Sequence, residues 1–285
     1  MYDRIMVGYD GSEHSKAALR EAAAWIKRHG GSATLVHGVY FNEEEFGAAP
    51  VQHEKRIEMG HSICIQAKET VSKEYGMEFE SLVCEGEPPE VLVNTARGKK
   101  ADLIALGTQG RRGIKRLILG SVTSRVIVES PCDVLAVKRP CSDCAGRYSS
   151  ILVPFDGSPH AKKALTRACQ LSNIDGGSVS VLYVVPRYEE MMEFFKTNSI
   201  NKSLLEEAEK IVETARGIAA SLGVTVRTLV KEGPASYTII EAAKENKSEV
   251  IVMGSHGWRG INRALMGSTT ERVIMTANCP VLVAR

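Results

Sequence analysis

Short apolar runs alternate with amphipathic stretches along the whole chain. A short and almost continuous apolar run is typical of a strand buried on both faces, and apolar residues three and four positions apart are typical of a helix. In the first half this pattern predicts strands at residues 5–9, 33–39, 79–84, 103–106 and 134–137, and helices at 12–28, 53–75, 88–99 and 121–129. Strands that alternate with helices predict an α/β fold with a parallel, doubly wound sheet.

The second half of the chain repeats the first. Residues 4–12 match residues 150–158, and equivalent positions keep an almost constant separation from there onwards. The repeat predicts two tandem five-stranded domains, at 1–139 and 148–285, joined by a linker at 140–147 that is rich in turn formers. The second half is expected to have strands at 151–154, 179–185, 226–230, 249–253 and 281–284, helices at 160–172, 203–222, 235–245 and 268–276, and, like the first half with 41–52, one irregular polar loop, at 186–201.

Composition narrows the classes of function. The chain has 285 residues, 44% of them hydrophobic, and a net charge of +2, which is too balanced to suggest binding to nucleic acid. Neither a signal peptide nor an apolar run long enough to cross a bilayer is evident, so we expect a cytoplasmic protein without membrane insertion. The seven cysteines are expected to be ordinary buried side chains, and Cys141 and Cys144 of the linker lack a second pair with zinc-site spacing.

A glycine-rich turn follows the fourth predicted strand of each half. The spacing G-x2-G-x9-G-S occurs at Gly107, Gly110 and Gly120, and again at 254, 257 and 267. Glycine lets the main chain approach a ligand, and the unpaired N–H groups at a helix N-terminus attract anions. If the strands take the order 3-2-1-4-5, these turns and the Asp-Gly-Ser that ends the first strand meet at one crevice in each half. The repeat therefore predicts two phosphate-binding sites.

Other nucleotide and catalytic motifs are missing. The sequence has no G-x4-G-K-[ST], no G-x-G-x-x-G after the first strand, no G-x-S-x-G and no HExxH. These absences argue against a P-loop, a dinucleotide fold, a serine hydrolase and a zinc protease. The remaining possibility is a nucleotide-sized phosphate site with no evident general base.

Both halves resemble the ATP-binding subtype of the universal stress protein family, whose motif is G-x2-G-x9-G-[ST]. Gly86, Gly233 and the C-terminal segment 279–284 agree with the family pattern. The resemblance implies the strand order given above and ATP, or ADP or AMP, in each crevice, with Mg²⁺ as an optional companion. It also implies pairing through the fifth strand, either between the two halves as an intrachain pseudo-dimer or in a homodimer.

The resemblance carries over to the residues at matching positions, with no catalytic residue and no protein metal ligand. In the first half the implied nucleotide-binding residues are Gly8, Tyr9, Asp10, Val39, Leu106, Gly107, Gln109, Gly110, Gly120, Ser121, Val122 and Thr123. In the second half they are Pro154, Phe155, Asp156, Val184, Met253, Gly254, His256, Gly257, Gly267, Ser268, Thr269 and Thr270.

Each assignment has a structural alternative. Asp-Gly-Ser is also a good helix cap, a serine after glycine is a common N-cap, and the motif glycines would also suit a turn with positive φ. Basic residues between the glycines would either screen phosphate charge or form a solvated face; they are Arg111, Arg112, Lys115, Arg116, Arg259 and Arg263.

We expect a regulatory protein in which nucleotide occupancy sets the conformation of loops 41–52 and 186–201 and thereby the binding of an unidentified protein partner. The alternatives are a slow Mg²⁺-dependent ATPase that uses His256, and a structural pseudo-dimer with empty sites. The halves also differ where adenine is expected to lie, with Gly38 in the first and Val184 in the second. Because an apolar contact is lost at Gly38, we expect tighter adenine binding in the second half.

Overall fold

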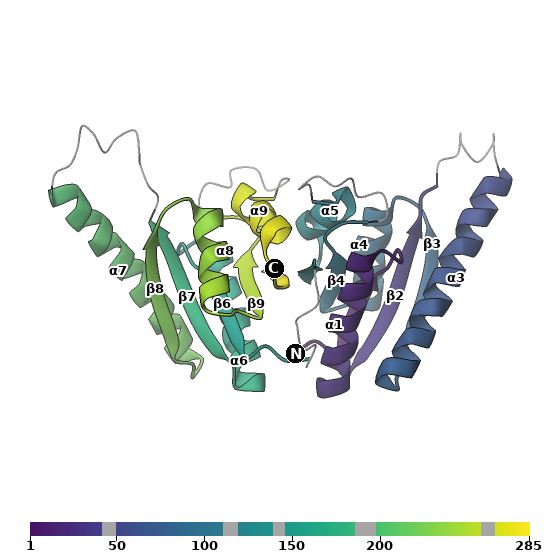
Figure 1. The fold of residues 1–285 in the computed structure, drawn as a ribbon, viewed down its shortest axis with the longest axis horizontal. Helices are drawn as coiled ribbons and strands as arrows, with labels where there is room; N and C mark the ends of the chain where they lie inside the picture. Colours follow the sequence, from purple (N-terminus) through teal and green to yellow (C-terminus); the bar gives the residue numbers. More distant parts are fainter. Residues whose placement is uncertain (42–49, 111–118, 139–145, 186–197, 258–265) are drawn as a thin grey trace. The chain divides into compact units, whose positions relative to one another are not determined.

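The computed structural model describes residues 1–41, 50–110, 119–138, 146–185, 198–257 and 266–285. It divides into two compact units, the first made mainly of Met1–Arg147 and the second mainly of Tyr148–Ala277 and Val281–Ala284. Each unit is an α/β domain that contributes five parallel strands (Figure 1).

In the first unit the strands pair in the order β3-β2-β1-β4-β5, as the family resemblance implies. Since β1 lies between β2 and β4, the crossovers on its two sides run in opposite directions and leave a crevice at the carboxyl ends of β1 and β4. The register places Gly8 beside Val36 on one side and Leu106 on the other. The strands are β1 (Arg4–Gly8), β2 (Ser32–Val39), β3 (Glu80–Glu85), β4 (Leu103–Gly107) and β5 (Asp133–Val137).

The helices of the first unit pack on both faces of its sheet. One layer contains α1 and α3, which contact each other, and the other contains α4 and α5, which also contact each other. Their bounds are α1 (Glu13–His29), α3 (Pro50–Tyr75), α4 (Pro88–Lys99) and α5 (Ser121–Glu129). The α1 helix begins where Ser12 caps it, because the Ser12 hydroxyl accepts a hydrogen bond from the Ser15 N–H at 3.2 Å.

The second unit repeats this arrangement, with strand order β8-β7-β6-β9-β10 and every neighbouring pair parallel. Its strands are β6 (Ser150–Pro154), β7 (Ser178–Val185), β8 (Val226–Glu232), β9 (Val250–Gly254) and β10 (Val281–Ala284). Its helices are α6 (Pro159–Asp175), α7 (Asn198–Ser221), α8 (Ala235–Glu245) and α9 (Ser268–Thr276). The predicted fold class and strand order are confirmed in both units.

Two predicted boundaries are wrong. The α3 helix begins at Pro50 and α7 at Asn198, so the expected loops 41–52 and 186–201 both end in helix. Proline fits the first turn of a helix, and the first residues of both helices carry no regular apolar repeat from which the helix start could be read. The rest of these stretches, 42–49 and 186–197, lies outside the described residues.

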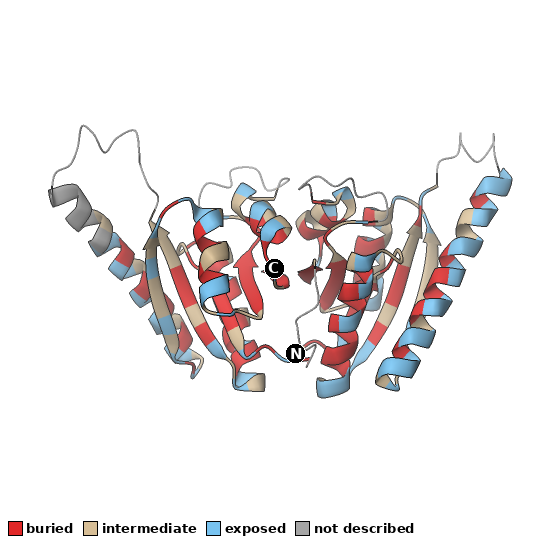
Figure 2. Cartoon of the chain, in the orientation of Figure 1, coloured by how far each residue is buried: buried red, intermediate tan, exposed pale blue. Residues whose placement is uncertain are grey.

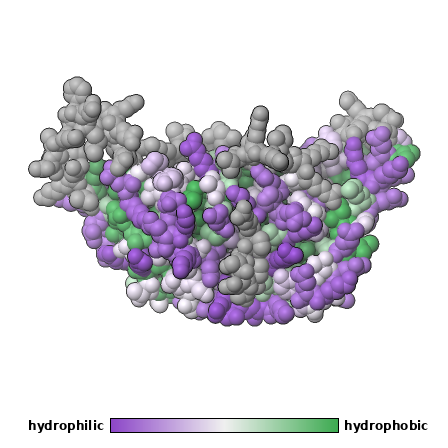
Figure 3. All heavy atoms as spheres, in the orientation of Figure 1, coloured by the Kyte–Doolittle hydropathy of each residue, from purple (hydrophilic) through white to green (hydrophobic). Residues whose placement is uncertain are grey.

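The central strands form the core of each unit. All residues of β9 and all but the last of β4 are buried, whereas β3 and β8, at the ends of the strand order, are largely half-exposed (Figure 2). On the face drawn in Figure 3, hydrophilic residues cover most of the described surface. No helix in the described part of the chain is long and apolar enough to cross a membrane.

Two cysteines, Cys64 and Cys169, are buried as expected, whereas Cys84, Cys132 and Cys279 are partly buried. Burial raises the pKa of the Cys132 and Cys169 thiols to about 11, and it raises the pKa of Cys64 as well. Thiols that stay protonated at neutral pH are poor nucleophiles and poor metal ligands. Cys141 and Cys144 lie outside the described residues.

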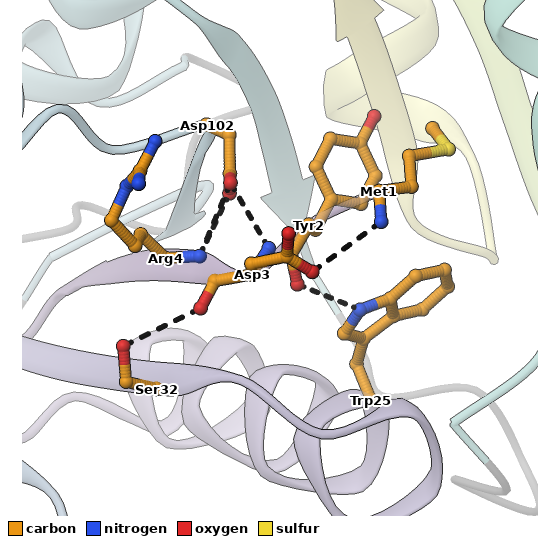
Figure 4. Close-up of polar contacts among 7 residues, drawn as sticks. All are labelled: Met1, Tyr2, Asp3, Arg4, Trp25, Ser32 and Asp102. Atoms are coloured by element: carbon orange, nitrogen blue, oxygen red, sulfur yellow. Dashed lines mark hydrogen bonds and ion pairs between the residues drawn. The ribbon is translucent and has the colours of Figure 1, made fainter.

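A carboxylate before the fourth strand fixes the start of the first strand in each unit. The Asp102 carboxylate accepts hydrogen bonds from the backbone N–H groups of Asp3 at 3.0 Å and Arg4 at 3.1 Å (Figure 4). In the second unit Glu249 accepts a hydrogen bond from the Ser149 N–H. The Trp25 indole N–H also donates a hydrogen bond to the Tyr2 carbonyl at 3.2 Å, which connects the segment before β1 to α1.

Glycine at the end of the fourth strand lets a helix approach the sheet closely. A Cβ at Gly107 would lie 2.6 Å from the carbonyl carbon of His14 and 2.7 Å from the Ser15 nitrogen, both in the first turn of α1. Gly254 has the same relation to α6, with a Cβ placed 2.6 Å from the His160 Cβ. Neither glycine has a positive φ, so packing against the helix requires it.

We therefore predict that Gly107→Ala lowers the free energy of unfolding by about 1–3 kcal/mol, because backbone atoms of α1 would have to move. Urea unfolding followed by circular dichroism measures the change. Gly98→Ala is the matched control, since that exposed glycine of α4 has no atom within 4 Å of an added Cβ. It should stabilise by about 0.5–1 kcal/mol. Equal stabilities of the two variants would contradict the packing role of Gly107.

Candidate functional site

A cavity of about 920 Å³ lies at the carboxyl edge of the first unit's sheet. The ends of β1, β2 and β4 line it together with the first turns of α4 and α5 and part of α3. All twelve positions predicted for this half line the cavity, and they are Gly8, Tyr9, Asp10, Val39, Leu106, Gly107, Gln109, Gly110, Gly120, Ser121, Val122 and Thr123. The topology has thus brought together two turns that are about a hundred residues apart in sequence.

The aspartate that follows the first strand shapes the local turn and also faces the glycine-rich loop. Oδ1 of Asp10 accepts a hydrogen bond from the Ser12 N–H at 2.9 Å, which is the turn chemistry considered as the alternative. A Cβ at Gly110 would lie 2.8 Å from Oδ2 of Asp10, so this glycine leaves room for the carboxylate. Neither Gly110 nor Gly257 has a positive φ. The turn role is therefore present, and it leaves one oxygen directed towards the loop.

The second unit has the same arrangement around Asp156. Its Oδ1 accepts from the Ser158 N–H at 3.0 Å, and a Cβ at Gly257 would lie 2.6 Å from its Oδ2. Most of the other predicted residues take the same places as in the first unit: Pro154 and Phe155 at the end of β6, Met253 and Gly254 at the end of β9, and Gly267, Ser268, Thr269 and Thr270 at the start of α9. Val184 in β7 takes the place of Gly38 and not of Val39.

The last motif glycine is itself the helix N-cap. Gly120 caps α5 with an extended backbone (φ −59°, ψ 136°), and Gly267 caps α9 in the same way. The structural alternative, in which Ser121 or Ser268 serves as the N-cap, is therefore excluded, since each is the first residue of its helix. The Gly120 N–H donates to the Thr108 carbonyl at 2.9 Å, so it is not available to a phosphate.

The first-turn N–H groups of α5 are directed out of the helix into the crevice. Residues 121–123 have no intrahelical acceptor because the first N–H groups of any α-helix lack one. Together with the helix dipole they make this end of the cavity attractive to an anion. Residues 268–270 at the start of α9 occupy the equivalent position.

The threonine of each motif holds the helix to the strand. The Thr123 hydroxyl donates to the Gly107 carbonyl at 2.7 Å, and the Thr270 hydroxyl donates to the Gly254 carbonyl at 3.0 Å. Both threonines are buried. Since each hydroxyl donates its proton within the protein, the predicted contact of Thr123 and Thr270 with a nucleotide would use their backbone N–H groups, and it stays a prediction.

The cavity also has residues that sequence reasoning missed. His37, Arg56, Met59, Pro88 and Leu92 line it, and two of them belong to α3. None of these residues belongs to a sequence motif, so only the predicted order of strands and helices could have indicated that they line the cavity. The Nδ1 atom of His37 lies 2.7 Å from the Tyr9 carbonyl oxygen, which fixes the ring at the end of β1.

The structure changes the reason for expecting weaker adenine binding in the first unit. A Cβ at Gly38 would lie 2.9 Å from the Pro88 Cα, so the space of a valine side chain is already filled by α4. Pro88 lines the cavity and presents an apolar surface there. Pro88 therefore replaces the apolar contact that a valine would make, and the tighter adenine binding expected in the second unit stays a prediction. The basic residues between the motif glycines, 111–116 and 259–263, lie outside the described residues.

Comparison with known proteins gives a consistent picture. A model described as the universal stress protein family matches residues 1–138 and again 147–285. A universal stress protein of Methanocaldococcus jannaschii is 33% identical over 140 residues, which cover 48% of this chain and 82% of that protein. One of Mycolicibacterium smegmatis is 25% identical over 297 residues, which cover 99% of this chain and 96% of that protein.

Among solved structures, a universal stress protein from Archaeoglobus fulgidus DSM 4304 matches with a TM-score of 0.70 and 20% sequence identity. The match covers 99% of this chain and 96% of that one, so it extends over both tandem units. It supports the fold.

The threonine contact gives a test of the site's framework. We predict that Thr123→Val, which keeps the side-chain shape, lowers the free energy of unfolding by about 1–3 kcal/mol because the partly buried Gly107 carbonyl loses this donor. Thr123→Ser keeps the hydroxyl and should lose less. Chemical denaturation of the two variants measures the difference. A valine variant as stable as the parent chain would show that the hydrogen bond does not hold α5 to β4.

Proposed function

The chain belongs to the universal stress protein family, and we propose that it is a regulatory protein that binds an adenine nucleotide, with ATP as the first candidate, in the crevice of each unit. The observation that carries this proposal is the cavity of about 920 Å³ at the switch point of the first unit's sheet. Its volume is within the range of about 300–1,000 Å³ that is usual for small-molecule sites.

The cavity wall offers both kinds of surface that a nucleotide requires. The N–H groups of residues 121–123 and the dipole of α5 favour phosphate oxygens. Val39, Pro88 and Leu92 offer an apolar surface for a base. Asp10 lies between β1 and the glycine-rich loop, where a carboxylate suits the hydroxyl groups of a ribose. Any Mg²⁺ would come with the nucleotide.

A route from the site to a partner runs through α3 in this proposal. Arg56 and Met59 of α3 line the same cavity, and Met59 has 55% of its surface exposed. A nucleotide that contacts the cavity wall would therefore bias the position of the N-terminal part of α3. A protein partner could then bind the outer surface of this helix in one position and not in the other. Pairing through the fifth strands and a cytoplasmic location belong to the same proposal.

The first test is mass spectrometry of small molecules released when freshly purified protein is denatured, with the amount per chain. We expect adenine nucleotide, close to two per chain if both crevices are filled. ATP alone supports a sensor, whereas ADP or AMP would make slow hydrolysis the better interpretation. Release of nothing, followed by no binding when ATP is added, would contradict the proposed function.

A second test removes one N–H group from each crevice. Proline fits the first position of a helix, and Gly120 and Gly267 already have the extended backbone that must precede it. We predict that Ser121→Pro and Ser268→Pro each weaken ATP binding at their own site about tenfold or more, with less effect on the other site. Isothermal titration of the two variants then gives the affinity of each unit separately.

The controls for this second test are Ser121→Ala and Ser268→Ala, which remove only the hydroxyl. They should bind more tightly than the proline variants, since the backbone N–H is retained. Proline variants that fold normally and bind ATP like the parent chain would exclude the helix N-termini as phosphate sites. A tighter site in the first unit would overturn the expected preference of adenine for the second.

A further inference from the structure

The second half of the sequence has two histidines, His160 and His256, and the fold brings them together. Their ring centres are 5.6 Å apart, with an angle of 49° between the ring planes. Both residues are half-buried, so neither ring is closed off from solvent. They are almost a hundred positions apart in the chain, and only the folded second unit makes them neighbours.

The backbone fixes this pair from both sides. His160 lies in the first turn of α6, where its Cβ packs against Gly254 at the end of β9. His256 follows two residues later, and its Nδ1 lies 3.0 Å from the hydroxyl oxygen of Ser255. Ser255 has no exposed surface, so it holds the His256 ring from inside the protein. Such a contact to one ring nitrogen orients the other nitrogen of a histidine, as the outer contacts of metal-binding histidines do.

We propose that His160 and His256 form a binding site for a divalent transition-metal ion, with Zn²⁺ as the best candidate. Imidazole is a preferred ligand of such ions. A metal ion at about 2.1 Å from one nitrogen of each ring holds the two ring centres roughly 5 to 6 Å apart, in agreement with the observed separation. The bond to the metal replaces the hydrogen bonds that these nitrogens make in its absence.

The protein supplies only part of the coordination shell. Within the described ranges no three histidine, cysteine or acidic side chains are grouped so as to hold a metal ion. Water therefore fills the remaining positions when the ion binds alone. If the proposed nucleotide site is correct, phosphate oxygens at the start of α9 can replace that water, and the ion then joins nucleotide to protein in this unit.

Charge near the pair favours a cation. The Asp156 carboxylate lies against Gly257, the residue that follows His256, and one of its oxygens accepts the Ser158 N–H. A carboxylate beside the neighbour of His256 attracts a cation bound at the pair.

The first unit lacks the pair. His14 takes the place of His160, but Gln109 stands where the second unit has His256. A glutamine side chain is a poor ligand for zinc compared with imidazole. The chain therefore contains a natural comparison site with the same backbone and one histidine fewer.

The experiment is a Zn²⁺ titration of the full-length, tag-free chain without nucleotide, against a chromophoric chelator, with metal content measured after equilibrium dialysis. All variants carry Cys141→Ser and Cys144→Ser so that the linker thiols cannot bind the ion. We expect about one tightly bound Zn²⁺ per chain. His160→Gln and His256→Gln should each lower the affinity at least tenfold, whereas His14→Gln should leave it unchanged.

Gln109→His is the decisive variant, because it builds the same pair in the first unit. We expect it to bind a second Zn²⁺ per chain, and we expect His14→Gln in that background to remove it again. Unchanged Zn²⁺ binding in His160→Gln and His256→Gln would overturn the proposal, as would a Gln109→His chain that still binds one ion at the same affinity. Because Zn²⁺ alone is the probe, failure of ATP binding would leave this result intact.

Discussion

The close approach of a helix to the end of the fourth strand is the constraint on which each crevice depends. In the first unit α1 packs so tightly on Gly107 that no Cβ can be accommodated, and α6 packs on Gly254 in the same way. This contact sets where β4 or β9 ends and where the glycine-rich turn begins. The threonine hydroxyl bonds, from Thr123 and Thr270 to the same two glycine carbonyls, then fix the next helix against the strand end. The open N–H groups of α5 and α9 are positioned as a result of these two contacts.

Sequence reasoning predicted the fold because its signals are local and repeated. Buried parallel strands appear as apolar runs, and two copies of every element reduce the chance of a wrong assignment. The helix starts at Pro50 and Asn198 were missed because polar first turns have no apolar period. Fold class followed from the chain itself, whereas the strand order, and with it the meeting of two distant turns at one cavity, was what the family resemblance implied.

The roles of individual site residues were harder to predict, since they depend on neighbours that are distant in sequence. Gly107 reads as a phosphate-binding glycine in the motif, but its missing side chain makes room for His14. Thr123 is predicted from the motif to bind the nucleotide, and its hydroxyl donates to the Gly107 carbonyl, so its backbone N–H is the donor left for a ligand. His37 and Arg56 carry no motif at all and enter the cavity wall because β2 and α3 meet there. A motif identifies positions, and tertiary packing decides what each position does.

The two units also show which positions can change without loss of the fold. Glycines 107 and 254 and threonines 123 and 270 are the same in both units, and all four lie in the contacts between strand and helix. Gln109, which lines the crevice of the first unit, is by contrast replaced by His256 in the second. A side chain that only faces the crevice contributes little to the packing of the sheet, so its replacement costs little stability. Two sites with the same backbone arrangement can therefore acquire different ligands through very few substitutions. The metal site proposed at His160 and His256 is an example of such a divergence.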